Sequence, residues 1–261
     1  MNFIANIWPV AVADGYKDTI LEELKKEGNI ISVHEIPLNY RGLRNYMIQI
    51  YRHEKWSGSF FNHFRGIPAK LNPCYHPDTP MFLVEFEGKD VESVLACKER
   101  IRKLCKHEKH SMHTSDTPEE YYLMKKILLH APTIELMNTV DLDKNRGFTK
   151  VFSRFLKMLR KYQLNPKDFL IVSEASKSLF GLQSGCFRKC KFSWVTRTKI
   201  KLPPKAEAFN QNEFQPVMEQ FTQDIYDTRN HISYCGITFV HPDIIQKMTQ
   251  QMSNYSSASE L

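Results

Sequence analysis

The chain has 261 residues, 42% of them hydrophobic, and a formal net charge of +7 at pH 7. That length and apolar content can supply two ordinary domains, each with a packed core. No apolar run approaches the roughly 20 residues that span a bilayer. The short apolar run at the start has no basic residue before it and is interrupted by Pro9. These features argue against a membrane span and a secretory signal, so we expect a cytoplasmic protein.

Six cysteines are scattered along the chain without the spacing of a disulfide framework: Cys74, Cys97, Cys105, Cys186, Cys190 and Cys235. Reduced thiols in a cytoplasm-like compartment are therefore expected. The one close pair, Cys186 and Cys190, has no second pair and no histidine near it in sequence, which makes it a weak zinc signal. We predict no bound metal and no cofactor.

The positive charge is concentrated in one part of the chain. Residues 144–205 contain 16 Lys and Arg but only Asp168 and Glu174, a net charge of +14, and the rest of the chain carries −7. Such a segment attracts polyanions, among them nucleic acids, nucleotide phosphates and acidic membrane surfaces. Solvated lysines on helix faces are the simpler explanation for part of this excess.

The first half of the chain alternates strand and helix patterns. Apolar runs predict strands at 3–8, 29–36 and 81–86, and helical spacing predicts helices at 18–27, 42–53 and 91–105. Gly28 is placed to end the first helix. The third helix is expected to turn Val94, Leu95, Ile101 and Leu104 inward, and an edge element is expected near 134–140. This order predicts an α+β domain of ferredoxin-like character over residues 1–140.

The clearest local signal is the stretch 109–120, which leads into a helix. Thr117 is a suitable N-cap, Pro118 fits the first helical position, and Glu120 stands three residues after the cap. This is the pattern of a capping box. We predict a helix that begins at Pro118 and extends to Leu128.

Two histidines, His110 and His113, lie just before this helix start. The free N–H groups at the start of a helix attract anions, so one hypothesis is that this stretch binds a phosphate next to a histidine side chain. The alternative is that the capping box only marks the start of the helix and that both histidines face solvent.

The second half begins after a polar stretch at 141–147, which is a reasonable linker. Apolar residues along 148–162 form one stripe with Lys and Arg off it, the pattern of a basic amphipathic helix. This helix could face a membrane or nucleic acid, but packing on its own domain is the expectation. We further predict strands at 169–172 and 191–195, helices at 174–180 and 243–252, and a disordered tail at 253–261.

Several features of the first half resemble nucleoside diphosphate kinases in their order. They are Ile7-Trp8-Pro9 in a strand, Phe60-Phe61 before a long loop, the strand 81–86, and His113-Thr114-Ser115-Asp116 at a helix start. That family places a phosphate-accepting histidine in an H-G-S-D turn, which implies a catalytic role for His113 with Ser115 and Asp116 in the polar positions. Trp8 stands where the family has a lysine, and Thr114 where it has a glycine. Loss of that lysine removes a phosphate clamp, so ordinary kinase turnover is not expected.

The second half resembles polymerase-beta-like nucleotidyltransferases. The run from Phe169 to Leu182 has their order of strand, small-residue turn and helix. Together with 100–138 and 231–252, it makes the chain similar to two-domain proteins of bacterial surface-polysaccharide gene clusters. Lys189-Cys190-Lys191 stands where the family has the Asp-x-Asp pair that holds magnesium. Asp224 and Asp227 are weak substitutes for that pair.

The ammonium groups of Lys189 and Lys191 repel metal ions but could bind phosphate directly. The resemblance therefore implies a small nucleotidyltransferase-like α/β domain at 148–252 without two-metal catalysis. The predicted phosphate-binding residues of the whole chain are His110, Ser115, Lys177, Lys189 and Lys191.

Three functions fit these patterns. The first is a pseudoenzyme, a degenerate nucleotidyltransferase-like protein that binds a nucleotide, nucleotide sugar or phosphorylated substrate in a basic groove. The second is an active transferase of surface-glycan assembly that uses His113. The third is a nucleic-acid-binding protein that uses the basic segment 144–205, in which Phe187, Phe192 and Trp194 either stack on bases or face the core.

Overall fold

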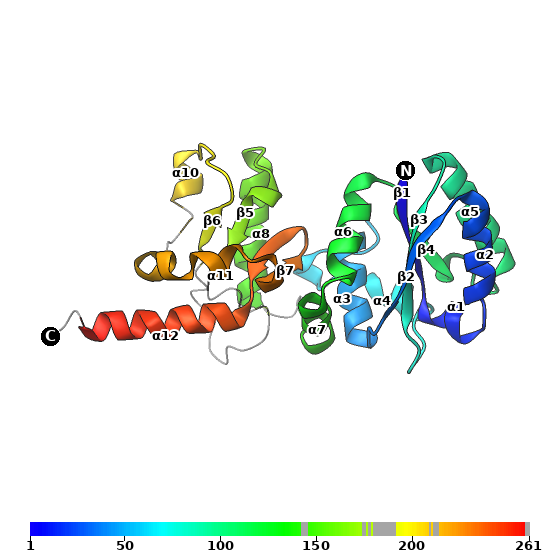
Figure 1. Cartoon of the computed structure of the whole chain (residues 1–261), viewed down its shortest axis with the longest axis horizontal. Helices are drawn as coiled ribbons and strands as arrows, with labels where there is room; N and C mark the ends of the chain where they lie inside the picture. Colours follow the sequence, from blue (N-terminus) through cyan, green and yellow to red (C-terminus); the bar gives the residue numbers. More distant parts are fainter. Residues whose placement is uncertain are drawn as a thin grey trace. The chain divides into compact units, whose positions relative to one another are not determined.

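The computed structural model describes residues 1–141, 146–173, 176, 179, 192–208, 210 and 214–258, without the side chains of residues 146 and 255–258. Over these residues the protein has a mixed α+β structure, which confirms the predicted fold class, and it contains two four-stranded sheets (Figure 1). Its internal contacts divide it into two units, Met1–Thr139 and Val140–Leu261. None of the helices in the described ranges combines the length and apolar character that crossing a membrane requires.

The sheet of the first unit has the strand order β2-β3-β1-β4. Its strands are β1 (Asn2–Ile7), β2 (Ile30–Ile36), β3 (Met81–Glu87) and β4 (Met112–Thr114). Every neighbouring pair is antiparallel, with β1 and β3 in the centre. This is the strand order of a βαββαβ, or ferredoxin-like, sheet.

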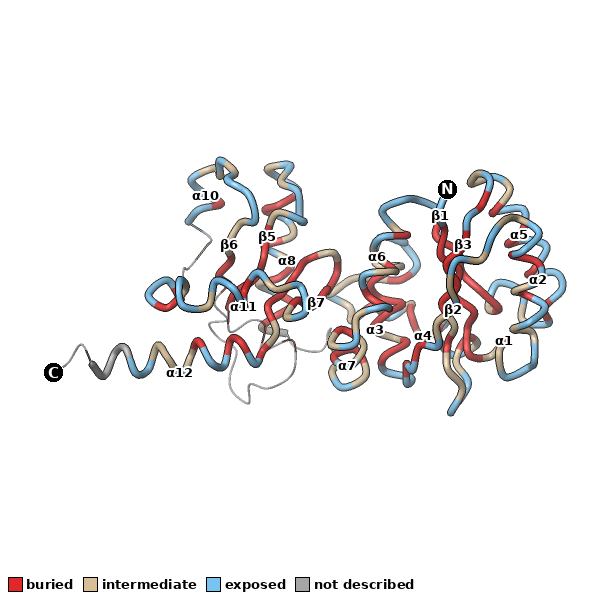
Figure 2. The backbone as a smooth tube through the Cα atoms, in the orientation of Figure 1, coloured by how far each residue is buried: buried red, intermediate tan, exposed pale blue. Residues whose placement is uncertain are grey.

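Helices cover both faces of this sheet, because successive residues of each strand point to opposite faces. Phe3 and Val84 pack with α2 (Lys17–Glu27) and α5 (Val91–Leu104) on one side. Ile4 and Leu83 pack on the other side. The helices there are α3 (Tyr40–Tyr51), α4 (Ile67–Leu71), α6 (Pro118–Leu128) and α7 (Ala131–Thr139). Figure 2 shows the buried residues concentrated along β1 and β3 and on the helix sides that meet them.

Shorter elements complete the first unit: α1 (Pro9–Ala13), η1 (Phe60–Asn62) and η2 (Glu108–His110). The predicted strands and helices up to α6 all form, but three details are wrong. Residues 131–139 form the helix α7 instead of an edge element, and the three-residue strand β4 was not predicted. Leu95 and Leu104 are 37% and 51% exposed, because the inward positions of α5 are taken by residues such as Cys97 and Lys98.

The sheet of the second unit has the order β6-β5-β8-β7. Its strands are β5 (Phe169–Ile171), β6 (Trp194–Thr196), β7 (His231–Tyr234) and β8 (Ile237–Val240). β5 and β8 are parallel, and the other neighbours are antiparallel. The helices are α8 (Arg146–Lys161), α10 (Pro204–Glu207), α11 (Thr222–Tyr226) and α12 (Pro242–Ala258), with η3 (Pro166–Asp168), η4 (Gln215–Phe221) and η5 (Thr228–Asn230).

The apolar stripe of α8 packs on its own unit, as predicted. Phe148, Phe152 and Phe155 are fully buried and contact the rings of Phe192 and Phe239. The hairpin β7–β8 was not predicted, because its turn uses Cys235 and Gly236 at positive φ instead of the usual Asn-Gly. α12 continues to Ala258, so the tail predicted at 253–261 is wrong for residues 253–258. The apolar face of α12 contains Ile244, Ile245 and Met248, and Met252 packs against the same cluster. Most of the helix predicted at 174–180 lies outside the described residues.

Candidate functional site

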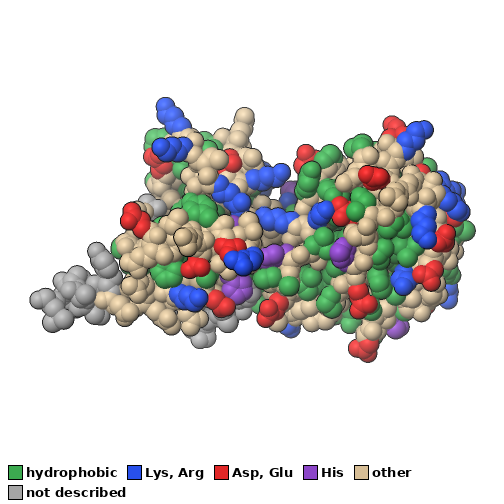
Figure 3. Space-filling view, in the orientation of Figure 1, with side chains coloured by type: hydrophobic (Ala, Val, Ile, Leu, Met, Phe, Trp, Pro, Cys, Tyr) green, Lys and Arg blue, Asp and Glu red, His purple; other side chains and the backbone are tan. Residues whose placement is uncertain are grey.

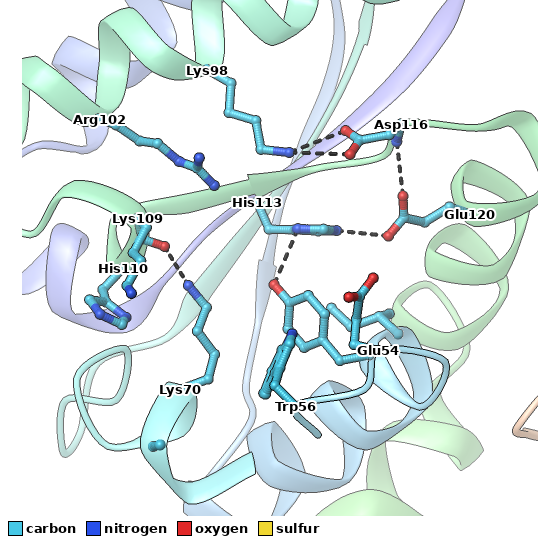
Figure 4. A pocket seen from close by; sticks show the side chains of 13 residues that line it. Glu54, Trp56, Lys70, Lys98, Arg102, Lys109, His110, His113, Asp116 and Glu120 are labelled. Carbon is cyan, nitrogen blue, oxygen red and sulfur yellow. Dashed lines mark hydrogen bonds and ion pairs between the residues drawn. The ribbon is translucent and has the colours of Figure 1, made fainter. Parts of the chain in front are cut away.

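A cleft of about 660 Å³ opens in the first unit beside β4 (Figure 4). Its walls come from the end of α3 and the loop that follows, from α4 and α5, and from the stretch that runs from η2 through β4 into α6. Both predicted histidines, His110 and His113, line it. The cleft is therefore the candidate site.

His113 is held between two side chains from different elements. It lies in the middle of β4, opposite Asn6 of β1, and is 8% exposed. Its Nε2 lies 2.9 Å from Oε1 of Glu120, and its Nδ1 lies 3.2 Å from the hydroxyl of Tyr51. The rings of Tyr51 and Trp8 contact the imidazole, at centroid distances of 5.3 and 6.4 Å. These contacts fix the plane of the ring.

The two partners also define which nitrogen carries a proton. Burial alone would raise the pKa of Glu120, but the hydrogen bond and charge of His113 and the backbone N–H of Asp116 outweigh it and leave that pKa below its ordinary value. The carboxylate can then only accept, so Nε2 is the donor. Burial raises the pKa of Tyr51 well above its ordinary value, so its hydroxyl keeps its proton. In a neutral imidazole, Nδ1 therefore holds the lone pair and accepts from Tyr51.

Glu120 lies in the first turn of α6. One of the two hydrogen bonds of the predicted capping box forms there, and the other is replaced. The side chain of Thr117 accepts from the backbone N–H of Glu120 at 3.2 Å, as predicted. The carboxylate of Glu120 reaches back one residue further than expected, to the N–H of Asp116 at 2.8 Å, and also binds His113. The predicted anion site at this helix start is thus taken by a carboxylate of the protein itself.

Four basic side chains line the cleft: Lys70, Lys98, Arg102 and Lys109. Lys98 and Arg102 stand four residues apart on α5, which puts them on one face of that helix. Lys98 is 6% exposed, and its ammonium lies 3.1 Å from the carboxylate of Asp116. Lys70 donates to the carbonyl of Lys109. Burial lowers the pKa of Lys70, and the charges of Arg102 and Lys109 act in the same direction.

His110 has a different environment from His113. Its Nδ1 lies 3.6 Å from the thiol of Cys74. Burial, followed by the charges of Lys70 and Lys109, lowers the pKa of His110 to about 4, and burial raises the pKa of Cys74 to about 12. At neutral pH the imidazole is uncharged and the thiol is protonated. His110 can therefore contribute a hydrogen bond to a ligand but no charge.

Ser115, the other phosphate-binding residue predicted in the first unit, does not line this cleft. Ser115 is 1% exposed, and its hydroxyl accepts from the N–H of Ile4 at 3.0 Å, so it joins β1 to the end of β4. The three lysines predicted in the second unit, Lys177, Lys189 and Lys191, lie outside the described residues. Trp8, which stands in place of a family lysine, is fully buried and cannot reach a ligand.

Sequence reasoning missed most of the groups that surround His113. The sequence predicts Tyr51 only as part of the helix at 42–53 and Glu120 only as part of the capping box. Lys98, Arg102 and Lys70 belong to no motif, because they meet only through the tertiary arrangement of α4 and α5 around the sheet. The spacing of Lys98 and Arg102 was the one local signal, because residues four apart on a helix share a face.

No three His, Cys, Asp or Glu side chains come together as a metal-binding group among the described residues. Asp227, a weak candidate from the sequence, is bound instead by Arg229 at 2.6 Å, and this hydrogen-bonded pairing lowers its pKa to about 2. Four of the six cysteines fall in the described ranges, and all four are buried free thiols: Cys74, Cys97, Cys105 and Cys235.

No protein family and no curated protein matches the chain. Among solved structures, it is similar to an orthorhombic crystal form of the nucleoside diphosphate kinase of Aquifex aeolicus, with 15% sequence identity and a TM-score of 0.32. That alignment covers 48% of this chain and 91% of the kinase. Similarity at this level does not establish a family.

Proposed function

We propose that the first unit binds the phosphate groups of a nucleotide or another phosphorylated small molecule, and that His113 accepts a phosphoryl group on Nδ1. The observation that carries this proposal is the fixed imidazole. In the neutral ring, Nε2 donates to the carboxylate of Glu120 at 2.9 Å and the lone pair is on Nδ1, in a cleft lined by basic side chains. An oriented, deprotonated nitrogen beside cations is what a phosphoryl acceptor requires.

In the proposed step, the lone pair of Nδ1 attacks phosphorus and forms an N–P bond. The bond from phosphorus to the leaving-group oxygen breaks, and its electron pair goes to that oxygen. The hydroxyl of Tyr51, which donates to Nδ1 in the free protein, turns to a phosphoryl oxygen. The proton of Nε2 stays on the ring, where the carboxylate of Glu120 stabilises the positive charge of the phosphorylated imidazole.

The basic side chains have a separate role in this proposal. Arg102 and Lys109 line the cleft as cations that can balance the charge of the phosphate and of the leaving oxygen. Lys98 is already paired with Asp116, so it contributes less free charge. This arrangement explains how a phosphate can be held although Trp8 has replaced the lysine of the resembling family.

The direct test is phosphorylation of the purified protein with γ-³²P-labelled ATP or GTP. We expect a label that is stable in alkali and labile in acid, as for phosphohistidine, and that His113→Gln abolishes. His76→Gln is the matched control, because His76 is exposed and bonds only within its own loop in the described structure. Absence of label, or equal labelling of both variants, would refute the transfer step.

Binding is tested separately by thermal-shift screening against nucleoside di- and triphosphates and nucleotide sugars, with and without magnesium. A ligand that binds only the folded protein raises its apparent stability. We expect stabilisation without magnesium, and a roughly tenfold loss of affinity in Arg102→Gln, from the loss of one charge-assisted contact. If no phosphorylated compound stabilises the protein, the cleft is not a phosphate site.

For the second unit, a nucleotidyltransferase-like pseudoenzyme stays a proposal. Its support is the small-residue turn after β5, in which the N–H of Ser176 donates to the carbonyl of Ser173 at 2.8 Å. The test is the same screen on Lys189→Gln/Lys191→Gln. Lower ligand stabilisation in this variant, with His113 phosphorylation unchanged, would support a second phosphate site. A role in surface-glycan assembly stays a prediction from resemblance.

A further inference from the structure

The outward face of α8 carries a row of basic side chains. Lys150, Arg154, Lys157 and Lys161 are spaced by four, three and four residues, so they form one stripe along the helix, and all four are exposed. At 1.5 Å per residue the stripe is about 16 Å long. The sequence of α8 itself contains no acidic residue.

The core fixes the direction in which this stripe points. The aromatic side chains on the opposite side of α8, Phe148, Phe152 and Phe155, are fully buried against Phe192 and Phe239. The helix cannot rotate without exposing these rings. The basic residues are therefore a preformed row.

Further exposed basic residues follow α8 in the sequence of the second unit. Lys167 lies in η3, and the N–H of Arg197 donates to the carbonyl of Asp168 at 2.9 Å, which places the end of β6 next to η3. The segment that follows adds the exposed Lys199, Lys201 and Lys205. On the face drawn in Figure 3, Lys and Arg side chains project around α10, which contains Lys205.

We propose that this basic face binds the phosphate backbone of a double-stranded nucleic acid without reading its sequence. A duplex carries one negative charge per roughly 1.7 Å of axis when both strands are counted, so about nine phosphate charges fall within the roughly 16 Å that the stripe spans. Four exposed cations in one row can neutralise part of this charge. The proposal concerns the second unit and is independent of the cleft at His113.

The same surface does not suit a membrane or a single strand. An interfacial helix inserts apolar side chains into the bilayer, but the one large hydrophobic residue that is strongly exposed in the described part of the second unit is Tyr226. Binding to single strands relies on aromatic side chains that stack on bases. Phe192 and Trp194 are 1% and 2% exposed, so they belong to the core.

The test is fluorescence anisotropy of the full chain with a labelled 24-base-pair duplex at 50 to 200 mM salt. The four residues of the α8 stripe should contribute about −3.6 to the slope of log affinity against log salt, a roughly 150-fold loss over this range. Lys150→Gln/Arg154→Gln should reduce the size of the slope by about 1.8. Lys103→Gln/Lys106→Gln, exposed residues of the first unit, removes the same charge and should change the slope little.

Three results would overturn the proposal: equal loss of binding in both double variants, an affinity that does not depend on salt, and tighter binding to the single strand than to the duplex. Binding to vesicles of phosphatidylserine and phosphatidylcholine is measured as well. Stronger binding to these vesicles than to the duplex would also refute the proposal. Circular dichroism checks that the variants are folded. His113→Gln should bind the duplex as the unchanged protein does, which separates this proposal from the phosphoryl-transfer proposal.

Discussion

Replacing Glu120 by Gln separates the chemistry of His113 from the charge of the cleft. The amide keeps the shape of the side chain, but its single oxygen can accept from only one of the two donors, Nε2 of His113 or the N–H of Asp116. It removes one negative charge next to the imidazole. The variant therefore tests whether the carboxylate acts through its charge.

The size of the effect follows from the two kinds of hydrogen bond. A bond to a charged group contributes about 1.5–3 kcal/mol and a neutral bond about 0.5–1.5 kcal/mol, so the change weakens the support of a phosphorylated imidazole by about 1–1.5 kcal/mol. The rate of phosphorylation should fall about 5- to 12-fold, since about 1.4 kcal/mol is a factor of ten. Binding of a phosphorylated ligand should not weaken, because the cleft has lost a negative charge.

The assay is single-turnover incorporation of ³²P, with ligand affinity measured in parallel by calorimetry. Glu119→Gln is the matched control, since Glu119 is an exposed neighbour on the same helix. The reasoning is wrong if Glu120→Gln is phosphorylated as fast as the unchanged protein. It is equally wrong if the control variant is slowed to the same extent, because the effect would then reflect only net charge.

Three predictions concern stability. Thr117→Ala removes the cap of α6 and should cost about 1 kcal/mol in urea unfolding, whereas Thr117→Ser should keep most of it. Gly28→Ala places a Cβ 1.8 Å from the carbonyl oxygen of Glu87 and should cost about 1–3 kcal/mol, so an unchanged urea midpoint would contradict the described close approach. Burial alone would raise the pKa of Glu85, but hydrogen bonds from Lys125 and Tyr121 hold it below 4.5, so its stabilising contribution is present at neutral pH and lost in acid. Glu85→Gln should therefore be less stable than the unchanged protein at pH 7 and closer to it at pH 3, and a gap that widens in acid would refute this.

The sequence predicted those parts of the fold that depend on local pattern. The alternation of apolar residues in 81–86 and the cap at Thr117 were sufficient for β3 and for the start of α6. β4 was missed because a strand of three residues, two of them polar, has no periodic signal. The hairpin of β7 and β8 was missed because its turn lacks the residues that usually mark one.

The sequence predicted His113 as the central residue of the site but not the side chains that surround it. His113 stands out beside a capped helix, but Tyr51 comes from 62 residues earlier in the chain. Ser115 looked available for a phosphate, yet the pairing of β1 with the end of β4 uses its hydroxyl. Contacts of this kind depend on tertiary packing, which spacing within one segment does not encode.

The carboxylate of Glu120 accepts hydrogen bonds both from the backbone at the start of α6 and from the imidazole of His113. A modification that changes the charge of the His113 ring should alter the strength of the hydrogen bond that this carboxylate accepts from the backbone N–H of Asp116. The rate at which that amide exchanges its hydrogen with deuterated solvent would then report the chemical state of the histidine. Hydrogen–deuterium exchange of the first turn of α6, followed by mass spectrometry, would then distinguish the modified from the unmodified imidazole without radioactive phosphate.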